Sequence, residues 1–104
     1  PTIYGNGQKR RDFIYVDDVV NACIKSISKG KGIYNIGTSK EISISKLYSN
    51  ISKLINEKKV KYKKAIPGEV IRSVLKCQKA KRELNWKSQV TLEQGIKKTI
   101  NYFK

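Results

Sequence analysis

The sequence predicts a small α/β fold: a mixed sheet with a hairpin, one parallel strand–helix–strand unit, and three to four helices. Three observations predict it. An Asn-Gly pair lies between two short apolar segments, apolar residues recur at helical spacing after the second of these, and a short strand candidate, Ile33-Tyr34-Asn35-Ile36, follows that helix. A length of 104 residues corresponds to a single domain, residues 1–104, with a modest core.

The hairpin is expected around Asn6 and Gly7, because both residue types tolerate positive φ. Residues 2–5 and 11–15 are its two strands. Tyr4 stands before the turn, and Arg11 lies where the chain enters the second strand. A flat ring and a forked cation on one rigid hairpin suit a ligand with a base and phosphates.

A helix is expected over residues 17–29, with Asp17 and Asp18 in the first turn, where the helix dipole favours negative charge. Gly30 ends it, and residues 33–36 form a strand, which predicts a right-handed parallel crossover. The helix is expected to bury one apolar stripe, formed by Val16, Val19, Val20, Cys23, Ile24 and Ile27.

Ser43 is expected to cap a second helix over residues 44–57. Residues 58–64 read as an edge strand protected by lysines, and residues 70–75 as a short strand. A short helix is expected over residues 78–84. Lys76 precedes it and cannot accept from backbone N–H groups, so its start should be irregular.

Thr91 and Gln94 have capping-box spacing and should open the last helix. Its inward positions are expected to be Leu92, Ile96, Ile100 and Phe103. Trp86 is expected to cover the junction of the last two helices.

Composition narrows the function classes. The chain contains no histidine, which removes Ser-His triads, histidine general bases and histidine metal sites. Cys23 is expected to be a small buried hydrophobe and Cys77 a free, half-buried thiol, and two distant cysteines build no metal site. No apolar run approaches the length of a membrane span. The use of two distant, unpaired cysteines suits a reducing cytoplasm.

The formal net charge is +15, from 23 basic and 8 acidic residues. A basic chain raises the alternative of a nucleic-acid-binding module. Most of these residues are Lys, however, whereas Arg is the usual residue for bidentate recognition of phosphates and bases. We therefore favour a general positive field that attracts a small anionic ligand.

Several motifs taken together resemble one enzyme family. They are Tyr4-Gly5-Asn6-Gly7, Arg11-Asp12-Phe13-Ile14-Tyr15-Val16, Tyr34-Asn35-Ile36-Gly37-Thr38, Pro67-Gly68-Glu69-Val70, and Lys79 to Trp86 followed by Leu92-Glu93-Gln94-Gly95. As a set, these resemble the carboxyl-terminal part of NAD-dependent sugar-nucleotide epimerases and dehydratases, which are extended short-chain dehydrogenases. UDP-glucose 4-epimerase is the most similar kind.

The resemblance implies four substrate-binding residues. Tyr4 would stack on the nucleobase, Arg11 would bind the diphosphate, and Glu69 would accept from the ribose hydroxyls. Arg72 would be a second phosphate ligand. The structural alternatives are a core tyrosine, a surface ion pair of Arg11 with Asp12, and an exposed turn glutamate.

Two departures from the family pattern concern the phosphate site and the helix that follows it. Some relatives have an additional Arg at the position of Ile66, which would strengthen the diphosphate site. Relatives usually have Asp at the position of Lys76.

The chemistry of such enzymes needs two features that this sequence lacks. One is a glycine-rich turn that leads into a helix and holds the NAD pyrophosphate. Gly5-Asn6-Gly7 does not replace it, because a strand is expected to follow. The other is a Tyr-x-x-x-Lys pair, and no tyrosine here has Lys four residues later.

The resemblance therefore implies that an upstream Rossmann domain binds NAD and carries the catalytic residues. We expect no catalytic, cofactor or metal residue in residues 1–104. The chain would be a fragment, inactive alone, that exposes apolar surface and self-associates. Its substrate would be a UDP-sugar. Within the family, a dTDP-glucose 4,6-dehydratase, a UDP-glucuronate decarboxylase and a hexosamine 4-epimerase remain open.

Overall fold

The computed structural model describes residues 1–56 and 59–104, and this part contains four helices and four short strands. The predicted α/β class is confirmed. The helices are α1 (Val16–Lys29), α2 (Ile44–Ile55), α3 (Gln78–Leu84) and α4 (Leu92–Phe103). The strands are β1 (Thr2–Tyr4), β2 (Arg10–Arg11), β3 (Ile42–Ser43) and β4 (Lys61–Lys63).

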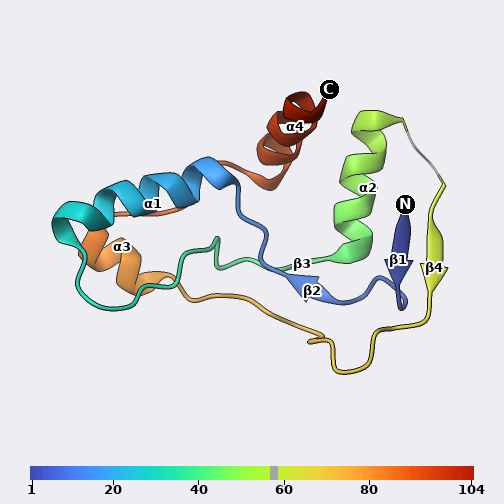
Figure 1. Ribbon diagram of the computed structural model, residues 1–104, viewed down its shortest axis with the longest axis horizontal. Helices are drawn as coiled ribbons and strands as arrows, with labels where there is room; N and C mark the ends of the chain where they lie inside the picture. Colours follow the sequence, from blue (N-terminus) through green and yellow to red (C-terminus); the bar gives the residue numbers. More distant parts are fainter. Residues whose placement is uncertain (57–58) are drawn as a thin grey trace.

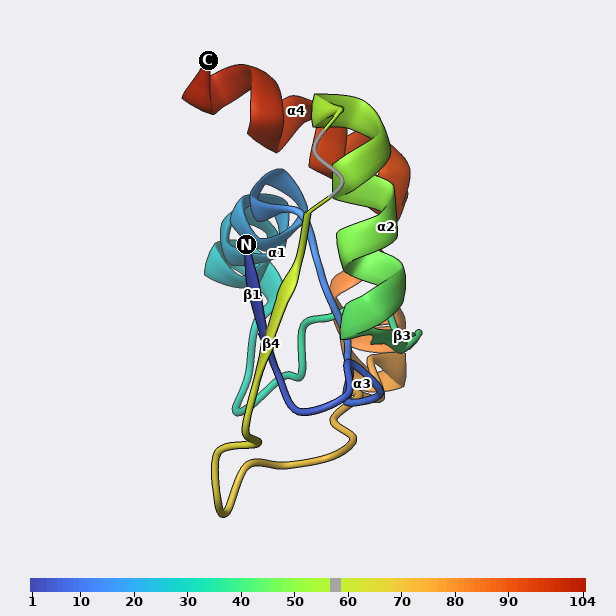
Figure 2. The ribbon, with the colours of Figure 1, turned by 90° about the vertical axis from the view of Figure 1, so that its right-hand side faces the viewer.

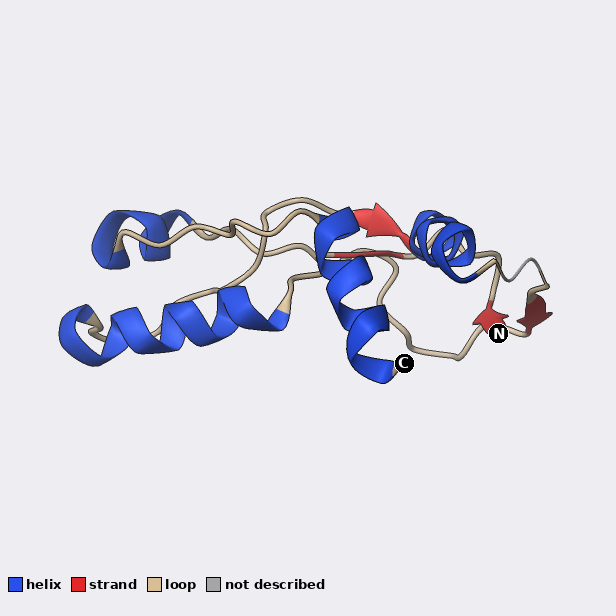
Figure 3. Ribbon diagram, turned by 90° about the horizontal axis from the view of Figure 1, so that it is seen from above, coloured by secondary structure: helices blue, strands red, loops and turns tan. Residues whose placement is uncertain are grey.

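The elements lie along one long axis (Figure 1). Helices α1 and α3 pair at one end, strands β1 and β4 lie at the other, and α2 stands between β4 and the centre (Figure 1). Figure 2 views the molecule from the end that carries β1 and β4, which run side by side. The molecule measures 46 × 34 × 17 Å, and its thinness is visible from above (Figure 3). Since one helix with its side chains is about 10–12 Å across, so thin a body leaves many apolar side chains at the surface.

The helices form where local patterns predicted them. Ser43 caps α2, because its side chain accepts a hydrogen bond of 3.1 Å from the Lys46 N–H. Thr91 and Gln94 form the complete capping box of α4. Helix α3 begins at Gln78, and its N-cap residue Cys77 makes no side-chain cap hydrogen bond, in agreement with the irregular start predicted from Lys76. Of the predicted second helix, residue 57 lies outside the described residues.

The predicted hairpin is wrong. β1 pairs in parallel with β4, and β2 pairs antiparallel with β3, so the two expected hairpin strands belong to different sheets. The hairpin turn would need positive φ at both central residues. Here Gly5 and Gly7 have φ of +80° and +76° while Asn6 does not, and the Asn6 side chain accepts from the Gln8 N–H. This turn redirects the chain toward β2 and does not fold it back onto β1.

Other strand predictions are also corrected. Residues 33–36 form no strand, so the expected parallel unit does not exist, and Tyr34 and Ile36 pack instead against the core. Residues 70–75 make a single bridge, between Arg72 and Arg10. The lysine-rich strand is confirmed as β4, although residue 58 lies outside the described residues.

The core lies between α1 and α3. Trp86 is 1% exposed and packs with Ala22, Ala80 and Leu84, so it covers this junction and not that of the last two helices. Cys77 belongs to the same cluster and is buried, where a half-buried thiol was expected.

Asp18 connects α1 to the segment before α4. Its carboxylate is 4% exposed and accepts hydrogen bonds of 3.1 Å from the backbone N–H groups of Gln89 and Val90. Its carbonyl accepts from the Trp86 indole N–H at 2.9 Å. A buried carboxylate is tolerable when its oxygens are hydrogen-bonded in this way.

The predicted burial of the α1 stripe is wrong. Helix α1 buries Asp18 and Ala22, whereas Ile24 and Ile27 are 61% and 86% exposed. Cys23, expected to be buried, is exposed as well. The reason is that α3 and Trp86 occupy the opposite side of the helix, and in the described residues only Val19 of the stripe is partly buried. Phe103 of α4, also expected inward, is exposed.

We predict that Asp18→Asn lowers the free energy of unfolding by about 2 kcal/mol, because hydrogen bonds to a charged acceptor typically contribute this much. Asp17→Asn is the matched control. Asp17 is exposed, so losing its interaction with the helix dipole should cost less than about 1 kcal/mol. Urea denaturation followed by Trp86 fluorescence measures both. Equal losses in the two variants would contradict the role of Asp18.

Candidate functional site

Strand β2 has a chain segment on each side. On one side it pairs with β3. On the other, the Arg10 N–H donates to the Ile71 carbonyl at 2.7 Å, and the Ser73 N–H donates to the Arg10 carbonyl at 3.1 Å. These bonds hold the segment after the Pro67-Gly68 turn beside β2. Residues about sixty positions apart in the sequence therefore become neighbours.

Arg11 and Glu69 are brought into contact by this pairing. A terminal nitrogen of Arg11 lies 3.7 Å from Oε1 of Glu69. The same guanidinium donates to the Arg10 carbonyl at 2.7 Å and to the Val70 carbonyl. The Lys9 ammonium contacts the other oxygen, Oε2 of Glu69, at 2.5 Å. Two cations thus flank one carboxylate, and sequence reasoning missed Lys9.

Arg72 belongs to a second cluster. Its Nε donates to Oε2 of Glu41 at 3.0 Å, and its terminal nitrogen donates to Oε1. Arg10 lies 3.7 Å from the same carboxylate. Because successive side chains of a strand point to opposite faces, Arg10 and Arg11 direct the two clusters to different sides of β2. The structure does not bring Arg72 to Arg11.

The electrostatics of the second cluster follow from this geometry. Hydrogen bonding from Arg72 lowers the pKa of Glu41 below its ordinary value of 4.5, against a smaller opposing effect of desolvation. The same hydrogen bond raises the pKa of Arg72. The pair is a two-pronged interaction of the kind that guanidinium groups form best.

Asp12 is not the partner of Arg11. Its carboxylate accepts hydrogen bonds of 3.0 Å from the N–H groups of Thr38 and Ser39, and also from the Thr38 hydroxyl. Ser39 in turn accepts from the Cys77 N–H through its side chain, at 3.2 Å. Asp12 therefore fastens the 37–39 turn and the start of α3 to the end of β2.

Tyr4 ends β1 and is 46% exposed, which contradicts a sealed core position. In the described part of the chain, no hydrogen bond, ion pair or ring contact joins Tyr4 to Arg11 or to Glu69. Of the four predicted residues, the structure joins Arg11 and Glu69. Tyr4 and Arg72 make no hydrogen bond or ion pair with that pair in the described part of the chain.

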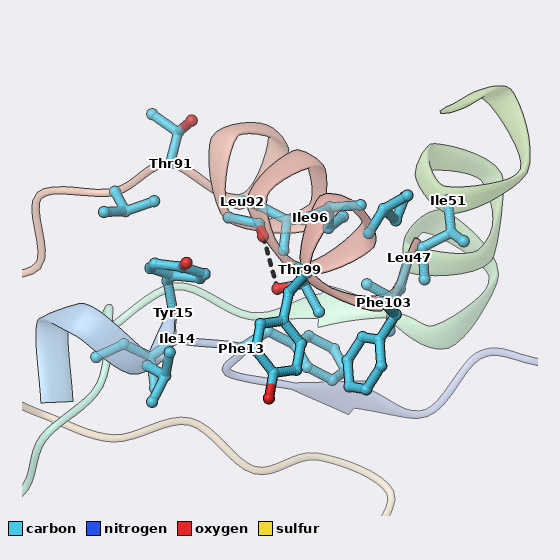
Figure 4. A pocket seen from close by; sticks show the side chains of 15 residues that line it. Phe13, Ile14, Tyr15, Leu47, Ile51, Thr91, Leu92, Ile96, Thr99 and Phe103 are labelled. Atoms are coloured by element: carbon cyan, nitrogen blue, oxygen red, sulfur yellow. Dashed lines mark hydrogen bonds between the residues drawn. The ribbon is translucent and has the colours of Figure 1, made fainter. Parts of the chain in front are cut away.

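A large apolar hollow lies elsewhere. A cavity of about 570 Å³ opens between the start of α1, helix α2 and helix α4 (Figure 4). Its walls are almost entirely apolar, and Gly95 lets α4 approach closely, because a Cβ there would stand 3.2 Å from that of Tyr15. Its labelled walls include Phe13, Tyr15, Leu47, Ile51, Leu92, Ile96 and Phe103. The sequence signal that could have indicated this hollow is the helical spacing of apolar residues in α2 and α4.

Two kinds of feature are absent from the described residues. They contain no group of three or more acidic, cysteine or histidine side chains placed to hold a metal ion. None of their helices has the length and apolar character that crossing a bilayer requires.

Comparison with known proteins decides the family. The model of the family described as GDP-mannose 4,6 dehydratase matches residues 1–99. The chain belongs to this family. The family includes epimerases as well as dehydratases among the relatives that follow.

Two curated relatives illustrate this. A putative UDP-glucose 4-epimerase of Methanocaldococcus jannaschii is 39% identical over 105 residues, a match that covers 100% of this chain and 34% of the relative. The dTDP-D-glucose 4,6-dehydratase of Mus musculus is 37% identical over 112 residues, covering 98% of this chain and 31% of the relative. The chain therefore spans about a third of the length of these relatives.

Solved structures of the family agree with the fold. UDP-glucose 4-epimerase of Thermotoga maritima, solved with UDP-glucose, superimposes with a TM-score of 0.94 and 38% identity over 98% of this chain and 34% of that one. The dTDP-glucose 4,6-dehydratase of Bacillus anthracis, solved with NAD, gives 0.88 and 28% over 98% of this chain and 33% of that one.

The described residues of this chain offer no pyrophosphate cradle for NAD. A pyrophosphate cradle needs a glycine-rich turn that opens a helix, whose N–H groups bind the phosphates. Here the Gly5–Gly7 turn leads to strand β2. The Gly7 carbonyl instead accepts from the Ser45 N–H in α2. The N-terminus of α2 lies against this turn, but the N–H groups of Ile44 and Ser45 are already bonded to the carbonyls of Lys9 and Gly7 and cannot bind a pyrophosphate.

We predict that Arg72→Met raises the pKa of Glu41 toward 4.5, because it removes the hydrogen bond that lowers it. The wild-type pair stabilises the fold above the unfolded-state pKa of Glu41. That contribution is lost as the pH falls through the lower folded-state pKa. An NMR titration of the Glu41 carboxyl carbon measures the shift. Arg82→Met, which removes a pair with Glu83, is the control and should leave Glu41 unchanged.

Proposed function

We propose that residues 1–104 are the carboxyl-terminal, nucleotide-sugar-binding part of an NAD-dependent 4-epimerase that interconverts UDP-glucose and UDP-galactose. The observation that carries this proposal is the contact of Arg11 with Glu69 across about sixty residues of sequence. Support comes also from the relatives, of which one is named a putative UDP-glucose 4-epimerase.

Arg11 has the donors for a diphosphate. A guanidinium carries five N–H groups, and the two hydrogen bonds to backbone carbonyls leave three for phosphate oxygens. Those two bonds also fix the plane of the fork, so less side-chain freedom is lost when the ligand binds. Its contact with Glu69, at 3.7 Å, is long and costs little to rearrange.

Glu69 would bind the ribose. Its two oxygens match the two hydroxyls of a vicinal diol, and each oxygen has a second lone pair beyond the one directed at its cation. Its side chain is 35% exposed, so a ligand can reach it. Tyr4 would stack on the base through its exposed ring, an interaction worth about 1–3 kcal/mol in single-strand binders.

The sugar would then react on another part of the protein. Binding energy from a remote nucleotide positions the reacting carbon without chemistry in this chain. NAD, which supplies the hydride acceptor in such a reaction, would be held by an upstream Rossmann domain together with the catalytic residues. Arg72 remains proposed as a second phosphate ligand, which would require its release from Glu41.

That upstream domain would also cover the apolar surface of this chain. The hollow beside α4 and the exposed stripe of α1 are both apolar, and about two thirds of each relative's length lies outside the match. The cytoplasm remains the proposed location, and self-association of the isolated chain remains a prediction.

A dehydratase acting on dTDP-glucose is the second candidate, favoured by relatives such as that of Mus musculus. A UDP-glucuronate decarboxylase and a hexosamine 4-epimerase also share the proposed nucleotide site. The nucleic-acid alternative has less support, because the family model and the relatives that match this chain are those of epimerases and dehydratases.

We predict that Arg11→Met weakens UDP binding to the complete protein by about tenfold to a hundredfold, the equivalent of 1.5–3 kcal/mol for charge-assisted hydrogen bonds. Arg11→Lys should recover only part, because an ammonium lacks the fork. Arg10→Met, from the neighbouring position of β2, is the matched control. Isothermal titration calorimetry measures all three. Equal affinities for the Arg10 and Arg11 variants would contradict the proposed phosphate role.

We predict that the isolated chain 1–104 neither binds NAD nor turns over UDP-glucose, because its glycine turn opens no helix. Fluorescence titration with NADH and a coupled galactose assay measure the two activities. The complete protein is the positive control. An NAD-linked activity of residues 1–104 alone would overturn the division of labour proposed above.

A further inference from the structure

Lys9 differs from most lysines of this chain, which are exposed. Its side chain is only 15% exposed, and its ammonium lies 2.5 Å from Oε2 of Glu69. Its backbone is fixed too, since the Ile44 N–H at the start of α2 donates to the Lys9 carbonyl at 2.9 Å. A long, flexible side chain is thus held at both ends, which costs side-chain entropy and indicates a specific placement.

We propose that Lys9 is a positioning residue that sets the Glu69 carboxylate for a ribose diol and so makes the site selective for ribonucleotides. This inference rests on the proposed function, in which Glu69 contacts the ribose. It goes further because it names Lys9 as the residue that orients Glu69, and ribonucleotides as the class of nucleotide that the oriented carboxylate selects.

The geometry of the first cluster supports this role. Residues 9 and 11 lie two positions apart, so their side chains leave the same face of the extended chain. Lys9 contacts Oε2 of Glu69 and Arg11 approaches Oε1, so each oxygen has its own cation. The close Lys9 ammonium holds Oε2, while the guanidinium near Oε1 is too far for a hydrogen bond, so Lys9 is the cation that restricts the orientation of the carboxylate plane. The unused lone pairs of the carboxylate then point in fixed directions, which a diol with two hydroxyls can match and a deoxyribose cannot.

The local charge supports the same ligand class. Lys9 and Arg11 together carry two positive charges against one on Glu69, so this side of β2 stays net positive while Glu69 stays an acceptor. On the other face, Arg10 and Arg72 are tied to Glu41 and do not compete for Glu69. A ligand with an anionic diphosphate beside a diol satisfies both features, and this describes a ribonucleoside diphosphate.

The test compares two probes, UDP and 2′-deoxyuridine diphosphate, on the complete protein by calorimetry. The wild type should prefer UDP. Lys9→Met should lose about tenfold in UDP affinity and lose most of the preference, while binding of the deoxy analogue changes little. Lys9→Arg should keep the preference, because it retains a donor to Glu69. Lys53→Met, at an exposed lysine of α2, is the control and should match the wild type.

A second variant separates positioning from folding. In a Glu69→Gln background, Lys9→Met should cause no further loss of the ribose preference, since its target has gone. If Lys9→Met keeps the preference, or weakens both probes equally, the positioning role is wrong while the proposed function stands. If the wild type binds neither probe, the proposed function itself fails. Should Lys9→Met fold poorly, Lys9→Gln gives the same comparison.

Discussion

Backbone hydrogen bonds on both edges of strand β2, Arg10–Arg11, hold together the part of this structure that carries the proposed nucleotide site. Strand β2 takes β3 on one edge and the segment around Ile71 to Ser73 on the other. Three parts of the chain therefore meet at a strand of only two residues. Backbone hydrogen bonds, and not side-chain packing, bring the Pro-Gly-Glu turn to the arginine, so the site depends on β2 more than on the distant core.

The alternation of side chains along this strand then sorts the charges. Lys9, Arg11 and Glu69 gather on one face, while Arg10, Arg72 and Glu41 gather on the other. Each face carries two cations and one anion. Most of the other residues that contribute to the formal charge of +15 are lysines. Placing one carboxylate between each pair of cations lets like charges stand close together without a ligand, and leaves each face positive toward an anion.

The sequence predicted the parts of the fold that local interactions decide. The caps at Ser43 and Thr91 and the bounds of the helices follow from neighbours a few residues away. Strand pairing could not be predicted, because the positive φ angles fell on Gly5 and Gly7 and left Asn6 outside the hairpin geometry. In the site, Arg11 and Glu69 were found through a resemblance. Lys9 and Glu41 carry no sequence signal, since an ion pair across sixty or thirty residues has no periodicity to detect.

Helix α1 buries the side opposite its apolar stripe, and this too was decided by contacts between residues far apart in the sequence. An apolar stripe predicts that a helix face is covered, not which polypeptide segment covers it, and here Trp86 and α3 take the side of Asp18 and Ala22. Residues 11–16 connect the ion-pair cluster to the apolar hollow. Arg11 belongs to the cluster with Lys9 and Glu69, while Phe13 to Val16 line the hollow. Covering the hollow would immobilise this segment. Under the proposed function, the covering domain would therefore fix the arginine that binds the diphosphate, so domain packing and nucleotide binding would stabilise each other.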